Sequence, residues 1–149
     1  MHPLEGLAKM TEFAGNNLAY NLEFIPAEKL SWKPAPSAKS ALEVVQHVTG
    51  ALNFMRPILT GGAYTRSEIP VPGDCRSAQE IVRSAAGEYA AALRQVDPGR
   101  LGEMIELPFG TFPLAQCCGF PPFDLMHHHG QVAYIQTLLG DQEDHFQMG

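Results

Sequence analysis

The stretch PFDLMHHHGQVAYIQTLLG, residues 122–140, predicts a helix near the end of the chain. Proline suits the first position of a helix and glycine suits the position after its end, so Pro122 and Gly140 give the expected bounds. The apolar residues between them recur at helical spacing and form one stripe, made up of Leu125, Val132, Ile135 and Leu139. A helix with one apolar stripe buries it against other helices, which the rest of the chain must supply.

Two further helices are expected in the first half of the chain. The first covers residues 4 to about 24, where apolar residues recur at helical spacing. The second begins at Ser40 and Glu43, which are spaced as a capping box. Its end is expected between Pro57, which can interrupt a helix, and Gly61, which suits a helix end.

A third helix and an irregular segment are expected before the last helix. Ser77 and Glu80 repeat the capping-box spacing, and the helix that they start ends before Pro98. Residues 100–122 are rich in glycine and proline, and within them MIELPFGTF, residues 104–112, predicts a short strand or extended segment. Four helices without long alternating segments indicate an all-α protein, a four-helix bundle.

Composition narrows the class of protein. The chain has 149 residues, and we expect residues 1–149 to form a single domain with one hydrophobic core. The net charge is −6 and the ten Lys and Arg residues are scattered, which argues against a nucleic-acid partner. No apolar run approaches the roughly 20 residues that span a bilayer, so we expect no membrane partner.

We expect a cytoplasmic location from the first residues and the cysteines of the chain. MHPLEGLAKM, residues 1–10, lacks the features of a secretory signal. Three cysteines, two of them adjacent, do not suggest a disulfide framework, so a reducing cytoplasm is the expected location. The tail from Asp141 is expected to be loosely held.

Three consecutive histidines lie in the last predicted helix. At about 100° per residue, His128 falls inside the apolar stripe, whereas His127 and His129 lie about 100° to either side of it. Asp124 is one turn before His128 and shares its face. His47 lies at the shoulder of the apolar stripe of the second helix. If these two helices are neighbours, His47, Asp124 and His128 can converge on one metal ion, and three protein ligands with room for water are usual in a reactive site.

Each of these residues also has a structural explanation. A single inward histidine is more often a hydrogen-bonded core residue than a metal ligand. Asp124 lies in the first turn of the predicted helix, where a negative charge is favoured by the helix dipole. Cys117 and Cys118 are soft ligands in principle, but adjacent cysteines chelate one ion awkwardly, and buried or free thiols are expected.

Three features together resemble the DinB-like (DinB/YfiT) superfamily of small bacterial proteins. IPAEKLSWKPAPSAKSALEVVQHVTG, residues 25–50, resembles a proline-bearing loop that leads into a helix with a histidine ligand. HHHGQVAYIQTLLGD, residues 127–141, resembles the closing helix of that family. The spacing of the helices between them also agrees. The resemblance implies an up-down-down-up bundle, with long loops between helices 1 and 2 and between helices 3 and 4, and often a homodimer.

The resemblance also implies a metal site of one histidine from the second helix and two from the last, four residues apart. The positions of this chain that match the three ligands of the family are His47, His128 and position 124, where this chain has aspartate instead of histidine. A second departure is His129, where the family has arginine. An aspartate can still ligate one divalent ion, with zinc or nickel expected first and manganese or iron as alternatives. The replacement is also consistent with a site that has weakened or lost its metal.

The expected function follows from the resemblance. It implies a metal-dependent enzyme acting on a small molecule, either a thiol S-transferase that uses a low-molecular-weight thiol or a hydrolase. His127, His129 and Glu43 are candidates for a general base by their proximity in sequence alone. The alternatives are a non-catalytic metal-binding or stress-response dimer and a bundle without metal that binds a small apolar ligand between its helices.

Overall fold

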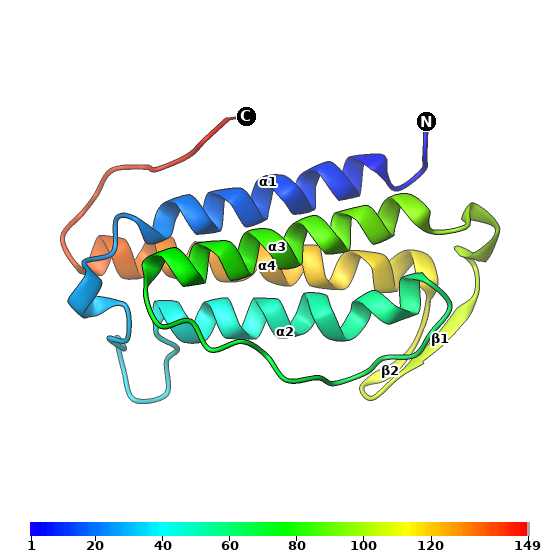
Figure 1. The fold of residues 1–149 in the computed structure, drawn as a ribbon, viewed down its shortest axis with the longest axis horizontal. Coiled ribbons are helices and arrows are strands. Elements are labelled where there is room, and N and C mark those ends of the chain that lie inside the picture. The colour runs from blue at the N-terminus through cyan, green and yellow to red at the C-terminus, as the bar shows by residue number, and fades with distance from the viewer. Residues whose placement is uncertain (149) are drawn as a thin grey trace.

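Four α-helices and a two-stranded hairpin make up the described part of the chain, residues 1–148 of the computed structural model (Figure 1). In chain order the elements are α1 (Glu5–Leu22), α2 (Ala41–Leu59), α3 (Cys75–Gln95), β1 (Met104–Leu107), β2 (Gly110–Pro113) and α4 (Leu114–Leu138). Short 3-10 turns lie at Ala27–Lys29 and Pro98–Arg100. The helices run up-down-down-up, since α2 and α3 share one direction and α1 and α4 the other (Figure 1). The predicted bundle and its helix order are therefore confirmed.

The helices form a four-sided arrangement in which α1 packs against α3 and α4, and α2 packs against the same two. Because the parallel helices α2 and α3 are consecutive, residues 60–74 must return along the whole length of the bundle (Figure 1). Long connections also join α1 to α2 and α3 to α4, as expected. No helix in residues 1–148 combines the length and hydropathy needed to cross a membrane.

The interface between α1 and α3, which we call the α1–α3 seam, is the most extensive helix pair. A Cβ atom at Gly15 would lie 2.5 Å from the Cβ of Ala86, so only glycine permits this close approach. At the end of the seam, the guanidinium of Arg94 donates to the carboxylates of Glu5 at 3.0 Å and Glu12 at 2.7 Å. Small residues inside and ion pairs at the end hold these two helices together.

Helix α2 follows the sequence prediction closely. Ser40 and Glu43 form the predicted capping box. Pro57 lies inside the helix without ending it, and the chain leaves the helix near Gly61, which has a φ of +90°. The guanidinium of Arg100 donates to the main-chain oxygen of Leu59 at 3.3 Å, which satisfies one of the free carbonyl groups at the helix end.

Helix α3 begins earlier than its predicted capping pair. The residue that caps it is Asp74, whose carboxylate accepts from the main-chain N–H of Ser77 at 2.7 Å. The Ser77 hydroxyl oxygen in turn accepts a hydrogen bond from the main-chain N–H of Asp74. Both Asp and Ser make good caps, and here the aspartate three residues upstream takes the role predicted for Ser77.

Helix α4 begins at Leu114, whereas the sequence predicts a start at Pro122. Pro121 and Pro122 lie inside the helix, where proline normally breaks the hydrogen-bond ladder. Pro122 has no N–H to offer the main-chain oxygen of Cys118, and the buried hydroxyl of Tyr89 donates to that oxygen at 3.1 Å instead. A tertiary contact therefore replaces one of the hydrogen bonds that the prolines remove.

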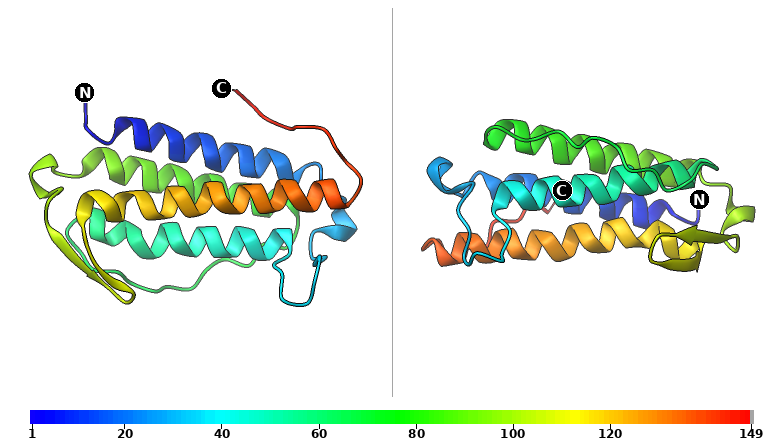
Figure 2. Two further views of the ribbon diagram at one scale, coloured as in Figure 1. Left: turned by 180° about the vertical axis from the view of Figure 1, so that it is seen from behind. Right: turned by 90° about the horizontal axis from the view of Figure 1, so that it is seen from below.

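The segment predicted to be extended, residues 104–112, forms a hairpin with an antiparallel register of Met104 to Pro113 and Leu107 to Gly110. The hairpin lies at the end of the bundle where α4 begins (Figure 2). The aromatic ring of Phe109 lies 6.1 Å from that of Phe120 on α4. The hairpin therefore brings aromatic side chains to one end of the interface between α2 and α4.

The tail is held to the bundle more closely than predicted. The side chain of Asn17 both donates to the main-chain oxygen of Gln147 at 3.1 Å and accepts from its N–H at 2.8 Å. The ring of His145 stacks on that of Phe24, with 3.4 Å between centroids. These contacts hold the tail against α1 and against Phe24, just after the end of that helix. Gly149 lies outside the described residues.

Candidate metal centre

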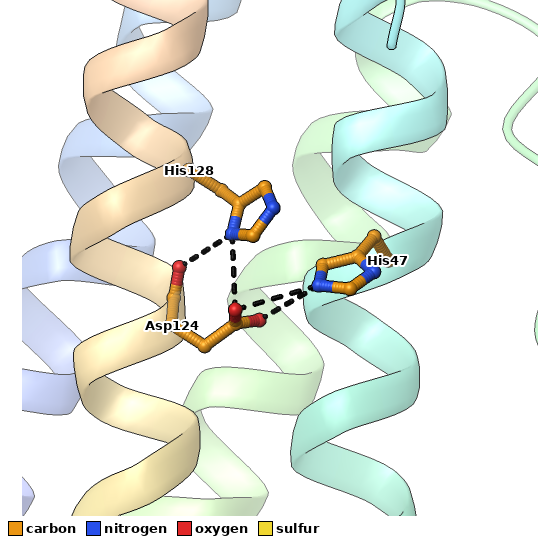
Figure 3. A group of neighbouring side chains, drawn as sticks. All are labelled: His47, Asp124 and His128. Atoms are coloured by element: carbon orange, nitrogen blue, oxygen red, sulfur yellow. Dashed lines mark hydrogen bonds and ion pairs between the residues drawn. The ribbon is translucent and has the colours of Figure 1, made fainter. Parts of the chain in front are cut away.

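The three predicted ligands meet between α2 and α4 (Figure 3). Nε2 of His47 lies 3.1 Å from Oδ2 of Asp124, and Nδ1 of His128 lies 3.2 Å from Oδ1 of the same carboxylate. The two imidazole rings are 4.3 Å apart between centroids. One candidate ligand atom from each residue lies within 4.8 Å of the other two, so the group could hold one metal ion.

The helices that carry these residues explain their convergence. Asp124 and His128 are one turn apart on α4, so both side chains leave the same face of the helix. The neighbouring α2 places His47 opposite them. The exposed fraction of the side chain falls from 41% for His47 to 29% for Asp124 and 8% for His128. The cluster is therefore closed on its α4 side and open toward solvent at His47.

The orientation of His128 is set by its own helix. Nδ1 of His128 lies 2.8 Å from the main-chain oxygen of Asp124, which can only accept a hydrogen bond. Nδ1 therefore donates to this oxygen, and Nε2 is the nitrogen that a neutral ring leaves free to bind a metal ion. A metal-binding histidine commonly has its second ring nitrogen fixed by a main-chain oxygen in this way.

The charges in the cluster favour a cation. Burial raises the pKa of Asp124, but hydrogen bonds from His128 and His47 outweigh burial and hold this pKa well below its ordinary value. The hydrogen bond between Asp124 and His128 also raises the pKa of His128. Oδ2 of Asp124 is buried and has no well-formed hydrogen bond within residues 1–148. An ionised oxygen without a full set of partners, next to two imidazoles, is a donor set that fits a divalent metal.

The other two histidines of the run stay outside the cluster. His127 is exposed and lies beside Phe123, with 6.4 Å between ring centroids. His129 is half-buried against Phe146, and burial lowers its pKa. The helical wheel therefore identified the one buried histidine correctly. The ring of His127 lies edge-to-face against that of His128, with 5.0 Å between centroids. Within residues 1–148, however, the group that could hold a metal includes neither His127 nor His129.

The remaining sequence candidates are engaged elsewhere. Glu43 accepts from the main-chain N–H of Ser40 at 2.9 Å and forms an ion pair with Lys33 at 2.8 Å. Cys117 and Cys118 are fully buried, and burial raises the pKa of Cys118 to about 11. Within residues 1–148, the group that could hold a metal contains no cysteine. The two thiols are therefore buried core residues.

Sequence reasoning missed the aromatic residues beside the cluster. A cavity of about 330 Å³ is lined by His47 and Asp124 together with Phe109, Phe120 and Phe123. The signal was available, because four phenylalanines recur within residues 109–123, a segment otherwise rich in glycine and proline. The sequence predicts Phe109 and Phe112 in the extended segment 104–112 and Phe123 in the last helix, but no predicted element brings the four rings together.

Comparison with known proteins agrees with this architecture. A DinB-like protein from Bacillus subtilis superposes with a TM-score of 0.75 and 16% identity, over 97% of this chain and 99% of the other. A DinB-like protein from Bacillus cereus superposes with a TM-score of 0.73 and 19% identity, over 94% and 95%. At such identities these likenesses show the fold alone. No curated protein matches the chain in sequence. The family model of the DinB superfamily matches residues 10–132, which include all three residues of the cluster, and the chain belongs to that superfamily.

Proposed function

We propose that this protein binds one divalent metal ion through His47, Asp124 and His128 and acts as a thiol S-transferase on a small molecule. The observation that carries the proposal is the convergence of three ligand-bearing side chains from two helices within 4.8 Å. Two histidines and one carboxylate suit zinc or nickel, with manganese or iron as the alternatives.

The residues of the cluster have separate roles in this proposal. His128 is held by its own helix, so it offers Nε2 in a fixed orientation. His47, the most exposed of the three, lies at the open side, where a substrate enters. Asp124 supplies a negative charge that offsets part of the metal charge. When bound, the metal ion supplies the positive charge that keeps a thiol sulfur deprotonated near neutral pH.

The carboxylate favours thiol chemistry over hydrolysis. Asp124 lowers the net charge of the site by one unit compared with three neutral histidines, which weakens its power to acidify a bound molecule. A thiol, with a pKa of about 8.5, needs little help to ionise near neutral pH, whereas bulk water has a pKa of about 15.7. The weakened site is therefore better suited to a thiol than to water.

Elemental analysis tests the proposal directly. The protein is purified without a histidine tag, and we expect one zinc or nickel per chain. After replacement of the metal by cobalt, the visible absorption spectrum should shift when glutathione is added, because a sulfur ligand changes the cobalt bands. If the protein contains stoichiometric metal but its spectrum does not shift when the thiol is added, the proposed S-transferase activity is refuted. Protein without metal that also fails to bind added zinc or nickel would overturn the metal centre.

A further inference from the structure

The cavity beside the cluster has walls from four parts of the chain. Ala51 and Met55 come from α2, Phe120 and Phe123 from α4, Phe109 from the tip of the hairpin, and Tyr64 from the connection after α2. His47, Asp124 and Pro121 complete the lining. A molecule in this cavity therefore contacts two of the three residues that we propose as metal ligands.

The lining of the cavity is apolar apart from the cluster. Among the described residues that form it, none is lysine, arginine or glutamate, and Tyr64 adds one hydroxyl. A charged group placed against these rings would lose its hydration without gaining a partner of opposite sign, which is costly. The cavity therefore selects an uncharged group.

The aromatic walls are supported from behind. Phe120 makes an edge-to-face contact with Phe112, with 5.1 Å between ring centroids, and Tyr64 makes one with Phe54 at 6.0 Å. Phe109 and Phe123 stand at the mouth, with 62% and 69% of each residue exposed. Aromatic pairs gain from offset or edge-to-face geometry, so a flat ring is the ligand that these walls suit best.

The size of the cavity sets the size of that ring. An apolar cavity of about 150 Å³ in a protein interior holds one benzene molecule. At about 330 Å³, this cavity holds one substituted ring or two fused rings. The many polar groups of a peptide or a sugar do not match this lining.

We propose that this cavity binds the uncharged aromatic half of the electrophile that the thiol attacks. This inference rests on the proposed S-transferase function, and it names the substrate class. With an activated aryl chloride, the thiol sulfur forms a bond to the ring carbon that bears chlorine. The carbon–chlorine bond breaks, chloride leaves with the electron pair, and the thiol proton passes to solvent, so the products are an aryl thioether, chloride and a proton.

The substitution Ala51→Leu tests the cavity without changing a residue of the cluster. The larger side chain occupies the space of the ligand, and leucine is nearly as good a helix former as alanine. Ala91→Leu, on an exposed position of α3, is the matched control. Binding of 1,3-dinitrobenzene, an unreactive probe, is measured by calorimetry. The rate with glutathione and 1-chloro-2,4-dinitrobenzene is measured in parallel, and metal content is determined for each variant.

We expect Ala51→Leu to weaken binding of 1,3-dinitrobenzene and to raise the KM for the aryl chloride by at least about tenfold, since small steric changes in apolar pockets have effects of this size. Metal content and the folded fraction should stay unchanged, and Ala91→Leu should behave as wild type. If Ala51→Leu fails to fold, Phe109→Ala removes an exposed wall and should also weaken probe binding.

The outcomes separate this inference from the proposed function. Metal-loaded wild-type protein that does not bind 1,3-dinitrobenzene, or binding that neither Ala51→Leu nor Phe109→Ala changes, would overturn the aromatic site and leave the metal centre intact. Saturable probe binding by protein that takes up no metal would overturn the metal centre and leave the aromatic site. Turnover of the aryl chloride with equal KM in all variants would overturn the assignment of the substrate class.

Discussion

The α1–α3 seam and the interface between α2 and α4 are built in opposite ways. In the α1–α3 seam, Gly15 meets Ala86 with no room for a larger side chain. Between α2 and α4, Asp124 lies between two imidazoles, and a cavity opens beside it. The α1–α3 seam leaves no space for a larger side chain at Gly15, whereas the interface between α2 and α4 has a cavity beside a group of side chains that could hold a metal ion.

This difference indicates that one interface of the bundle contributes mainly to stability and the other mainly to the proposed function. Close packing of small residues stabilises a fold without offering chemistry, and a partly buried carboxylate with incomplete hydrogen bonding offers chemistry at some cost in stability. Changes in the α1–α3 seam should therefore alter unfolding and spare metal binding. Changes in the cluster should do the reverse.

The largest expected effect is on metal binding. His128→Ala should lower zinc affinity by more than about 100-fold, because loss of even an outer hydrogen-bonding partner of a ligand costs about 10–100-fold. His127→Ala, the adjacent exposed control, should keep wild-type affinity. Competition titration against a zinc chelator measures both. Equal loss in the two variants would refute the assignment of His128 as the inward ligand.

Replacing Asp124 distinguishes a charged ligand from a structural residue. Asp124→Asn removes the charge and should weaken zinc binding, though less than loss of His128 does. Asp124→His gives the ligand set that the resemblance implies for the family, and it should retain zinc. The same titration measures both variants. If Asp124→Asn binds zinc as tightly as wild type, Asp124 is not a ligand.

A change in the α1–α3 seam should affect stability instead. Gly15→Val places a branched side chain against Ala86 and should lower the free energy of unfolding by about 1–3 kcal/mol, the usual range for overpacking. Gly6→Val, in the same helix but with open space around its Cβ position, is the matched control. Urea denaturation measures both, and zinc affinity of the folded protein should not change. A loss of zinc binding in Gly15→Val would contradict the prediction that changes in the α1–α3 seam spare metal binding.

The hydroxyl of Tyr89 reaches from α3 to α4, and its removal should have a smaller effect. Tyr89→Phe keeps the ring but leaves the main-chain oxygen of Cys118 without its donor. We expect a loss of about 1–2 kcal/mol in the free energy of unfolding, typical of a buried acceptor left unpaired. Urea denaturation, with Tyr134→Phe at an exposed position as control, measures it. Equal stability of the two variants would show that the tyrosine does not support the prolines of α4.

The smallest effect is expected at the ion pairs of Arg94. Hydrogen bonds from Arg94 lower the pKa of both Glu5 and Glu12 in the folded state. Their contribution is therefore present above the unfolded-state pKa of about 4.3 and is lost as the pH falls through the lower folded-state values. Arg94→Met should be slightly less stable than wild type at neutral pH, and the difference should vanish in acid. Urea midpoints across this pH range measure it, and a constant difference would refute the linkage.

The sequence predicted those features that depend on helical periodicity. The positions of His128 and Asp124 follow from 3.6 residues per turn, and the neighbouring α2 brings His47 to them, as expected. The predicted start of α4 was wrong because the hydrogen-bond donor to the Cys118 carbonyl, Tyr89, is 29 residues away in sequence. Sequence rules treat proline as a helix breaker because it removes a main-chain hydrogen bond. They consider neighbouring residues only, so they do not include a donor from a distant part of the chain.

The aromatic cavity was missed for a similar reason. Phe109 belongs to a hairpin and Phe120 to a helix, so no single periodicity relates them. Only the folded arrangement brings both rings to the end of α2. The order of the helices, by contrast, came from the resemblance of two sequence motifs and was confirmed by the structure.

The distance along the chain between the two halves of the cluster has a consequence for how the protein is made. His47 and Asp124 are separated by 77 positions, and α4 is the final helix of the described chain. During synthesis, α1, α2 and α3 are made before the partners of His47, which lie on α4. The three proposed ligands can therefore hold a metal ion together only after α4 has been made, and a nascent chain arrested before α4 should be unable to bind it.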